Sequence, residues 1–410
     1  MNIRSVTCFL TVNTSTMRED IRKAGRLAGE VRTALELGGF PVQTSRLATQ
    51  PLSHLPDDPL PLADQLWVRC EDAGFEYLSL GPVLTDAPGV GPSAFQGETE
   101  ELAWLEAIPQ IIQTTSSVFV SVLVASRTNG LNLWAVRRTA WIIEQIARTT
   151  ELGFGNLRLA TLANVGPHTP FFPAAYHDGG PPALAIAMEA ADLAVRVFSE
   201  ASSLDEAQVR LIAAVEAASR QIIALVHPLT ERHEVRFIGL DFSLAPFPEE
   251  ARSIGAAIER LGVDRFGAPG TLFAASFLTD CLRRANYPHC GFNGLMLPVL
   301  EDAVLAARSQ EGLFTINDLL LYSAVCGTGL DTVPLPGDIQ VEELAGILLD
   351  VAMLALRLDK PLTARLMPIP GARAGDQTQF DFPYFANGRV LAVKGLGSRA
   401  LFERGSWFAS

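Results

Sequence analysis

The hydrophobic residues of this chain alternate between short apolar runs and segments with helical spacing. Residues 6–12 form an apolar run that predicts a strand, and apolar residues at helical spacing over 21–35 predict the helix that follows. Residues 118–124 are apolar on both faces, as expected of a parallel strand that is covered on both sides. Continued in this way, the pattern predicts about five β-α units in the first part of the chain.

The alternation continues to the C-terminal end. Two long helices are predicted near residues 183–200 and 204–229, the second opened by a capping box of Ser203 and Glu206. A strand is predicted at 235–242, and the last strands at 364–369 and 390–393. Because no low-complexity linker divides the alternation, we expect an α/β fold in a single domain over residues 1–410.

Composition and charge narrow the classes of partner. The 410 residues carry a net charge of −13 and contain no run of Lys and Arg, which argues against nucleic acid and membrane surfaces as partners. The apolar runs are much shorter than the ~20 residues of a membrane span, and the N-terminal segment does not resemble a signal peptide. The five cysteines form no CxxC pair, which indicates reduced thiols. We therefore expect a cytoplasmic protein with a small-molecule ligand; a homo-oligomer is compatible with this composition.

Four polar segments rich in Gly and Pro interrupt the pattern beside predicted strands, at residues 164–180, 239–243, 326–338 and 380–387. Parallel sheets place their ligand sites in the loops at the carboxyl ends of strands. Polar residues of these segments are therefore candidates for substrate binding, and they are Asn164, Tyr176, Thr328, Asp381 and Asn387.

Cys326 and His177 are candidates for catalysis. Cys326 opens a Gly-Thr-Gly turn after an apolar helix, where loop amides or a nearby histidine would favour a nucleophilic thiolate. The alternative is a buried cysteine that packs at the end of a helix. His177 is either an acid, base or ligand, or a structural histidine.

Acidic residues lie at the ends of several predicted elements: Asp241, Glu301, Asp302, Asp331, Asp338 and Asp381. Such carboxylates could hold a divalent cation or act as acid and base, and the alternative is that they cap helices and turns. We assign Asp241 and Asp331 to acid/base chemistry, and Glu301 and Asp338 to a metal. No Walker A, GxGxxG, HExxH or GxSxG motif is present, so the sequence predicts no nucleotide cofactor.

Four long segments, at residues 164–177, 292–302, 322–338 and 380–390, resemble the signature segments of an uncharacterised prokaryotic family, domain of unknown function 711. The resemblance implies a ten-stranded α/β barrel like that of pyruvate formate-lyase and anaerobic ribonucleotide reductase. It also adds Asn293, in the second segment, to the substrate-binding candidates. The glycyl radical motif of those enzymes resembles Arg-Val-x-Gly, whereas here Arg389 and Val390 are followed by Leu391 and Ala392. A glycyl radical enzyme is therefore not expected.

The leading hypothesis is a cytoplasmic enzyme that acts on a small polar metabolite inside a barrel pocket. The competing hypothesis is a non-catalytic metabolite-binding or regulatory protein that has the same pocket. A third is a structural interaction protein, which would lack a concave polar cavity.

Overall fold

A single mixed sheet runs through the computed structural model, which describes residues 1–55, 58–86, 100–395, 397–405 and 407–408. The strand order is β8-β7-β1-β2-β3-β4-β6-β10-β9, with β5 and β11 paired beside β4. Most neighbours are parallel; the antiparallel pairs are β1 with β7, β6 with β10, β4 with β5, and β5 with β11. The strands are β1 Asn2–Leu10, β2 Ser45–Thr49, β3 Tyr77–Leu84, β4 Val118–Ser126, β5 Gly130–Asn132, β6 Leu159–Ala163, β7 Ala183–Glu189, β8 Arg236–Ala245, β9 Gly329–Pro336, β10 Leu362–Ile369 and β11 Trp407–Phe408.

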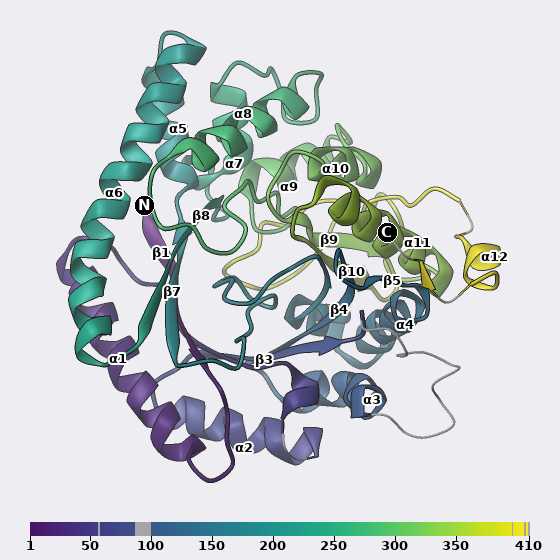
Figure 1. Ribbon diagram of the computed structural model, residues 1–410. Coiled ribbons are helices and arrows are strands. Elements are labelled where there is room, and N and C mark those ends of the chain that lie inside the picture. Colours follow the sequence, from purple (N-terminus) through teal and green to yellow (C-terminus); the bar gives the residue numbers. More distant parts are fainter. Residues whose placement is uncertain (56–57, 87–99, 396, 406, 409–410) are drawn as a thin grey trace.

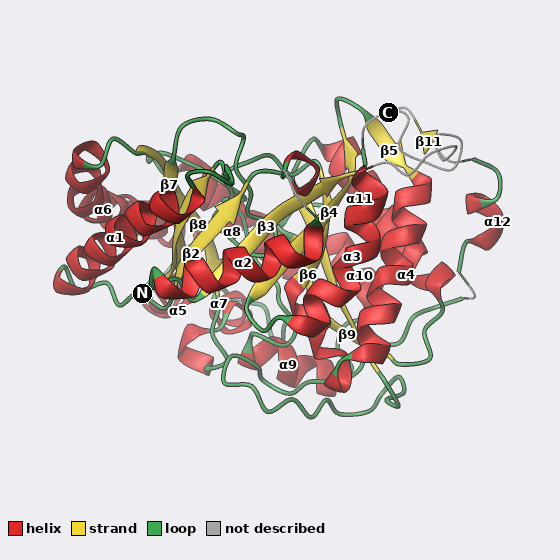
Figure 2. Ribbon diagram, turned by 90° about the horizontal axis from the view of Figure 1, so that it is seen from below, coloured by secondary structure: helices red, strands yellow, loops and turns green. Residues whose placement is uncertain are grey.

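Helices surround the outer face of this curved sheet (Figure 1), and the view from below shows α1 and α2 lying across the strands (Figure 2). The α-helices are α1 Met17–Leu37, α2 Pro59–Asp72, α3 Glu100–Thr114, α4 Leu133–Thr149, α5 Ala191–Glu200, α6 Leu204–Arg232, α7 Ile254–Arg260, α8 Thr271–Arg284, α9 Ala303–Gln310, α10 Ile316–Ser323, α11 Val341–Leu358 and α12 Arg399–Phe402. Short 3-10 helices lie at η1 Leu52–His54, η2 Glu151–Arg158 and η3 Glu250–Arg252. None of the described helices is long and apolar enough to cross a membrane.

The sheet is not closed into a barrel by a ladder of strand pairs. In the described residues β8 and β9 are its two edges, and an irregular segment, residues 287–302, lies between them. This segment forms one isolated bridge to β8, at Leu240 and His289, and another to β9, at Pro298 and Asp331. The predicted α/β class is therefore confirmed, and the predicted closed barrel of ten strands is not.

The inside of the curve is filled by loops. The largest apolar cluster lies between the sheet and the helices, whereas three smaller clusters join the inward side chains of the strands to residues of three loop segments, 165–175, 290–300 and 380–390. Figure 1 shows the loop between β6 and β7 crossing this interior. The loops leave a cavity among them.

The prediction of a helix near residues 183–200 is wrong in its first half. Residues 183–189 form β7, which pairs with β1 and β8, and the helix α5 begins at Ala191. The Ala-rich sequence of β7 has high helix propensity, but all seven of its residues are buried between two neighbouring strands. Burial in the sheet outweighs that propensity.

The segment 326–338, predicted to be a loop, contains β9. β9 contains two prolines and one glycine, which are unusual in a strand. They are tolerated here because β9 is at the edge of the sheet. The predicted strand at 390–393 is not one of the strands. The predicted N-cap Ser203 accepts a hydrogen bond from the Glu206 amide at 3.2 Å, as expected of the first half of a capping box.

Candidate functional site

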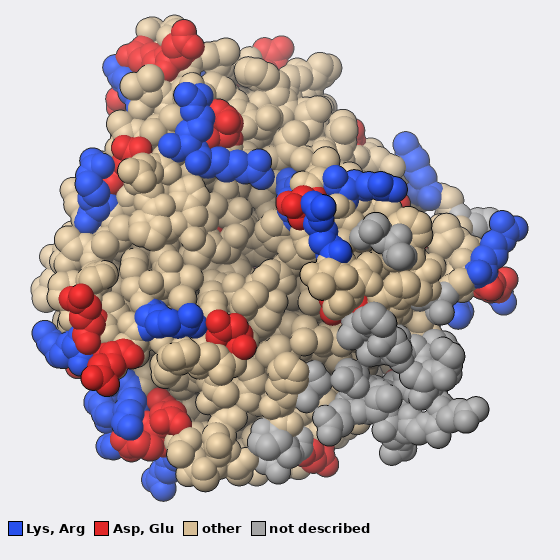
Figure 3. Space-filling view, viewed as in Figure 1, with Lys and Arg blue, Asp and Glu red and all other residues tan. Residues whose placement is uncertain are grey.

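A cavity lies inside the curve of the sheet, between the strands and the loops. About 900 Å³ of empty space lies within it, including solvent at its open side. Its lining residues are Arg4, Gln43, Thr44, Arg46, Tyr77, Phe119, Leu157, Ala160, Phe171, Phe172, Pro173, Ala174, Ala245, Pro246, Phe292, Met296, Pro298, Glu301, Thr328, Asp331, Thr363, Arg365, Phe382 and Tyr384. On the face shown in Figure 3, charged side chains lie mostly toward the rim and the centre is largely uncharged. The charged residues of the cavity belong to its lining, and they are Arg4, Arg46, Glu301, Asp331 and Arg365.

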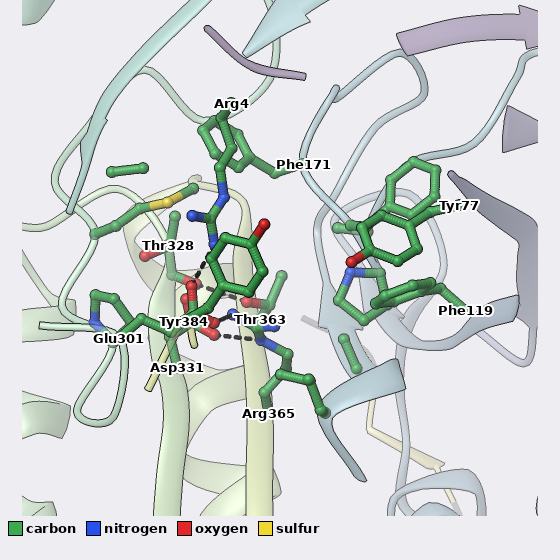
Figure 4. Close-up of a pocket in the computed structure, with 18 of the residues that line it drawn as sticks. Arg4, Tyr77, Phe119, Phe171, Glu301, Thr328, Asp331, Thr363, Arg365 and Tyr384 are labelled. Atoms are coloured by element: carbon green, nitrogen blue, oxygen red, sulfur yellow. Dashed lines mark hydrogen bonds and ion pairs between the residues drawn. The ribbon is translucent and has the colours of Figure 1, made fainter. Parts of the chain in front are cut away.

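A continuous row of ion pairs begins beside the cavity, at Arg252 and Glu189, and its other four members line the cavity wall. In order, its members are Arg252, Glu189, Arg4, Glu301, Arg365 and Asp331. The guanidinium of Arg4 lies 3.4 Å from a carboxylate oxygen of Glu189 and 2.6 Å from one of Glu301. The guanidinium of Arg365 lies 2.8 Å from a carboxylate oxygen of Glu301 and 2.5 Å from one of Asp331 (Figure 4). The four members that line the cavity are two arginines and two carboxylates, so their charges balance. Outside the cavity, Arg252 also pairs with Glu249, at 3.4 Å.

Arg46 is a further cation in the cavity and has no such partner. It is only 6% exposed, and no carboxylate of the described residues lies within ion-pair distance of its guanidinium. Its Nε donates to Thr44 Oγ1 at 2.8 Å, and the guanidinium lies over the rings of Tyr77 and Phe172, 5.4 and 5.1 Å from their centroids. Burial, together with the charge of Arg4, lowers the pKa of Arg46 to about 9, so it is still protonated at neutral pH. The cavity therefore carries one surplus positive charge.

Strand geometry explains why these charges point inward. Successive side chains of a strand point to opposite faces. On β2, Leu47 packs in the cluster beneath the helices, and Ala48 packs in an inner cluster. Arg46 therefore shares the inner face with Ala48. On β10, Leu366 likewise belongs to the outer cluster, which leaves Arg365 to face the cavity.

The two carboxyl groups beside Arg365 differ in their pKa. Burial raises the pKa of Glu301, but Arg365 and Arg4 outweigh burial, so its pKa lies below the ordinary value. Burial also raises the pKa of Asp331, and here Arg365 does not fully compensate, in part because Glu301 adds a like charge. Asp331 is therefore the carboxyl of the cavity that takes up a proton more readily.

A family model described as Uncharacterised ACR (DUF711) matches residues 1–385. The chain belongs to this family. The UPF0210 protein of Pyrobaculum arsenaticum is 34% identical over 367 residues, which cover 87% of this chain and 79% of that protein. UPF0210 proteins of Methanopyrus kandleri and Corynebacterium glutamicum are 31% and 26% identical and cover 87% and 90% of this chain, and 81% of each relative. The names of these relatives state no activity.

Three of the residues selected from the sequence line the cavity: Glu301, Thr328 and Asp331. Cys326 does not line it. Cys326 is fully buried and belongs to the apolar cluster between sheet and helices. Its carbonyl accepts a hydrogen bond from Lys360, whose ammonium also donates to the carbonyl of Ser323 at 3.0 Å and so completes the end of α10.

Asp241 and Asn293 are buried together, outside the cavity lining. The Asp241 carboxylate accepts hydrogen bonds from the amides of Phe292, Asn293 and Ser243 at 2.7, 3.1 and 3.1 Å. Asn293 in turn accepts from the Phe242 amide and from the Tyr287 hydroxyl. The pair therefore fixes the irregular segment to β8, and burial raises the pKa of Asp241 to about 6.

Replacing Asp241 with asparagine is expected to lower the free energy of unfolding by about 1–3 kcal/mol, because an amide NH₂ would face donors that now point at a carboxylate oxygen. Urea denaturation followed by circular dichroism measures this. Asp338→Asn, at an exposed position of the loop after β9, is the matched control and should change little. Equal stability of Asp241→Asn and the unsubstituted protein would contradict the role of Asp241 in holding the segment.

The remaining candidates are in separate places. Asn164 lies within hydrogen-bond distance of Asp359, and the Tyr176 hydroxyl donates to the carbonyl of Val165. Asn387 accepts from the amide of Phe380 and stabilises its own loop. Asp338 and Asp381 are exposed, and neither lines the cavity. His177 packs against His168, as described below.

Sequence reasoning did not select Arg4, Arg46 or Arg365, which carry the positive charges of the cavity. All three lie within short strands whose other residues are mostly buried. Arginine is rarely buried unless it is paired or functional, so an arginine inside a predicted strand is a usable signal. Asp302 shows the capping alternative instead, since it accepts hydrogen bonds from the amides of Val304 and Leu305 at the start of α9.

Proposed function

We propose that this protein is an enzyme that binds a small metabolite through a carboxylate or phosphate group in the cavity, and that Arg46 holds this anion. The surplus charge of Arg46 carries the proposal. A buried, unpaired cation destabilises a protein by several kcal/mol, and an anionic ligand offsets that cost. A guanidinium also presents two parallel N–H groups that match a carboxylate or a phosphate.

The rest of the lining indicates what the anion is attached to. Aromatic rings form much of the wall, including Tyr77, Phe119, Phe171, Phe172 and Tyr384. In Figure 4, Tyr77 and Phe119 lie across the cavity from Glu301, Asp331 and Arg365. The centre of a water-sized sphere can reach only about 90 Å³ of the cavity, so the proposed ligand is a small molecule. The proposed substrate is therefore an anion with a planar or apolar body.

Asp331 is the proposed acid or base. It is buried, it lines the cavity, and its pKa is raised, so it can exchange a proton with a bound molecule. Arg365 orients it through the Nε hydrogen bond. The Arg365–Asp331 contact is also compatible with a non-catalytic binding protein, because a carboxylate held by a guanidinium can be purely structural.

Two broader predictions also belong to this proposal. We propose that the fold is a barrel of the pyruvate formate-lyase type whose tenth element is the irregular segment at residues 287–302, since it bridges to both β8 and β9. We also propose a cytoplasmic protein, which is supported by five cysteines that are all free.

The proposal is tested by a thermal-unfolding screen of small carboxylates and phosphate esters on the full chain. A true ligand at about 100 times its dissociation constant is expected to stabilise the protein by about 2.7 kcal/mol. The neutral amide or alcohol analogue of each hit is the matched control and should give no stabilisation. Equal stabilisation by the neutral analogue would contradict recognition of the anion by Arg46.

Asp331→Asn separates catalysis from binding. This variant should keep the ligand-induced stabilisation and slow turnover of the ligand, followed by NMR, by about 100-fold. If the unsubstituted protein binds the ligand and leaves it unchanged, the protein is a binding or regulatory protein instead.

A further inference from the structure

Two histidines and an aspartate meet at the base of the loop between β6 and β7. The distance between His168 Nε2 and His177 Nδ1 is 3.0 Å. Asp178 Oδ1 lies 3.3 Å from His177 Nδ1 and 3.5 Å from His168 Nε2. Among the described residues, this is the group of His, Cys, Asp and Glu side chains whose ligand atoms come within 4.8 Å of one another. Glu301 and Asp338, the metal ligands predicted from the sequence, are not members of it.

These distances match the spacing of ligands around a tetrahedral metal ion. With metal–ligand bonds of about 2.0–2.1 Å, two ligands of a four-coordinate Zn²⁺ are about 3.3 Å apart. The three observed separations lie within a few tenths of an ångström of this value. A metal ion could therefore bind the three atoms with small side-chain shifts.

The hydrogen bond of His177 prepares its other nitrogen for a metal. His177 Nε2 lies 3.0 Å from the carbonyl oxygen of Gly180, and since a carbonyl only accepts, Nε2 carries the proton. In the neutral imidazole, Nδ1 then presents its lone pair toward His168 and Asp178. A histidine that ligates a metal commonly donates its second N–H to such a carbonyl.

His168 is held in place by the backbone. Its amide donates to the carbonyl of Tyr176 at 2.8 Å, and its φ of +64° lies in the left-handed region that non-glycine residues rarely adopt. Its ring packs edge-on against Phe9. Such strain is concentrated at functional sites, and here it directs the ring toward His177.

Arg236 is the cation nearest to this group. Its guanidinium lies 3.3 Å from Asp178 Oδ2 and 3.4 Å from His168 Nε2. The side chain is 43% exposed, so it can move away from His168 while it keeps the pair with Oδ2. Asp178 Oδ1 is then available to bind the metal ion, and Arg236 orients the Asp178 carboxylate through Oδ2.

We propose that His168, His177 and Asp178 bind one divalent transition-metal ion of the Zn²⁺ type, with water as the fourth ligand on the exposed side of Asp178. Two imidazoles and one carboxylate form a ligand set typical of Zn²⁺. The ion joins the two ends of the segment 168–178, whose residues 171–174 line the cavity. It therefore fixes a cavity wall, and its binding does not depend on the proposed substrate.

Isothermal titration of the EDTA-treated full chain with Zn²⁺ tests this site. One equivalent is expected to bind, and Co²⁺ in its place is expected to give the intense visible absorption of a four-coordinate ion. Asp178→Asn and His168→Gln should weaken Zn²⁺ binding by about 100-fold or more. His227→Gln is the matched control, because His227 lies 3.5 Å from Glu231 on the exposed face of α6, and it should bind as the unsubstituted protein does.

Circular dichroism shows whether each variant is folded. If His168→Gln does not fold, Asp178→Asn, at a partly exposed position, decides the question. The proposal is overturned if the unsubstituted protein binds no Zn²⁺, or if Asp178→Asn binds it with equal affinity.

Discussion

Replacing Arg46 with methionine is expected to stabilise the ligand-free protein by about 1–4 kcal/mol, because the substitution removes a buried charge that has no ion pair among the described residues and leaves a side chain of similar length. The same change is expected to weaken binding of the anionic ligand by about 2–5 kcal/mol, since the bound anion would then be buried without its cation. A gain in stability together with a loss of binding is the combination that a functional charge predicts.

Urea denaturation without ligand and calorimetric titration with the hit from the screen measure the two effects. Arg158→Met is the matched control, because Arg158 is also largely buried but donates to the backbone carbonyls of Ile112 and Val118, away from the cavity. That variant should lose stability, by about 1–3 kcal/mol, and keep its affinity for the ligand. If Arg46→Met were destabilised and bound the ligand normally, Arg46 would be structural.

Replacing Arg365 with glutamine is expected to destabilise the protein by about 3–5 kcal/mol at neutral pH. The reason is that Glu301 and Asp331 would stay buried, and Asp331 would lose its only ion pair among the described residues. Arg308→Gln is the matched control. Arg308 also joins two carboxylates, those of Glu259 and Glu311, but at a more exposed site, so the expected cost is about 1 kcal/mol or less.

The deficit of Arg365→Gln is expected to shrink as the pH falls. In the unsubstituted protein the lowered pKa of Glu301 means that its ion pairs stabilise the fold above the ordinary pKa and are lost as the pH drops. Without Arg365, burial dominates at Asp331 and raises its pKa further. The folded variant then takes up protons before the unfolded chain does and regains stability toward acid pH. Urea midpoints measured from neutral to mildly acidic pH test this, and a constant deficit would contradict it.

The alternation of strands and helices was predictable where burial and propensity agree. Residues 118–124 form β4 with a small change at its end, and the helical spacing over 21–35 lies within α1. The prediction failed at β7, where an Ala-rich run is a strand because two neighbours pair with it. Such pairing is a tertiary effect that no local window contains.

The candidate site was predictable only in part. Glu301 and Asp331 were selected because they lie at element ends, and Thr328 because it lies in a polar segment, and all three line the cavity. Arg46 and Arg365 lie within strands, and their roles depend on which face of each strand is turned inward. His168 lies in the polar segment at residues 164–180, but its contact with His177 depends on a left-handed backbone that the sequence does not reveal.

The row of ion pairs joins residues that a ribosome releases at very different times. Arg4 and Glu301 are 297 positions apart, and Arg365 follows Glu301 by a further 64. During synthesis, β1 must therefore persist with Arg4 unpaired to Glu301 until most of the chain has emerged, and such non-local contacts form slowly. A product that terminates before β10 would have Asp331 without its guanidinium and Glu301 with that of Arg4 alone, so we expect it to be less stable than the finished chain.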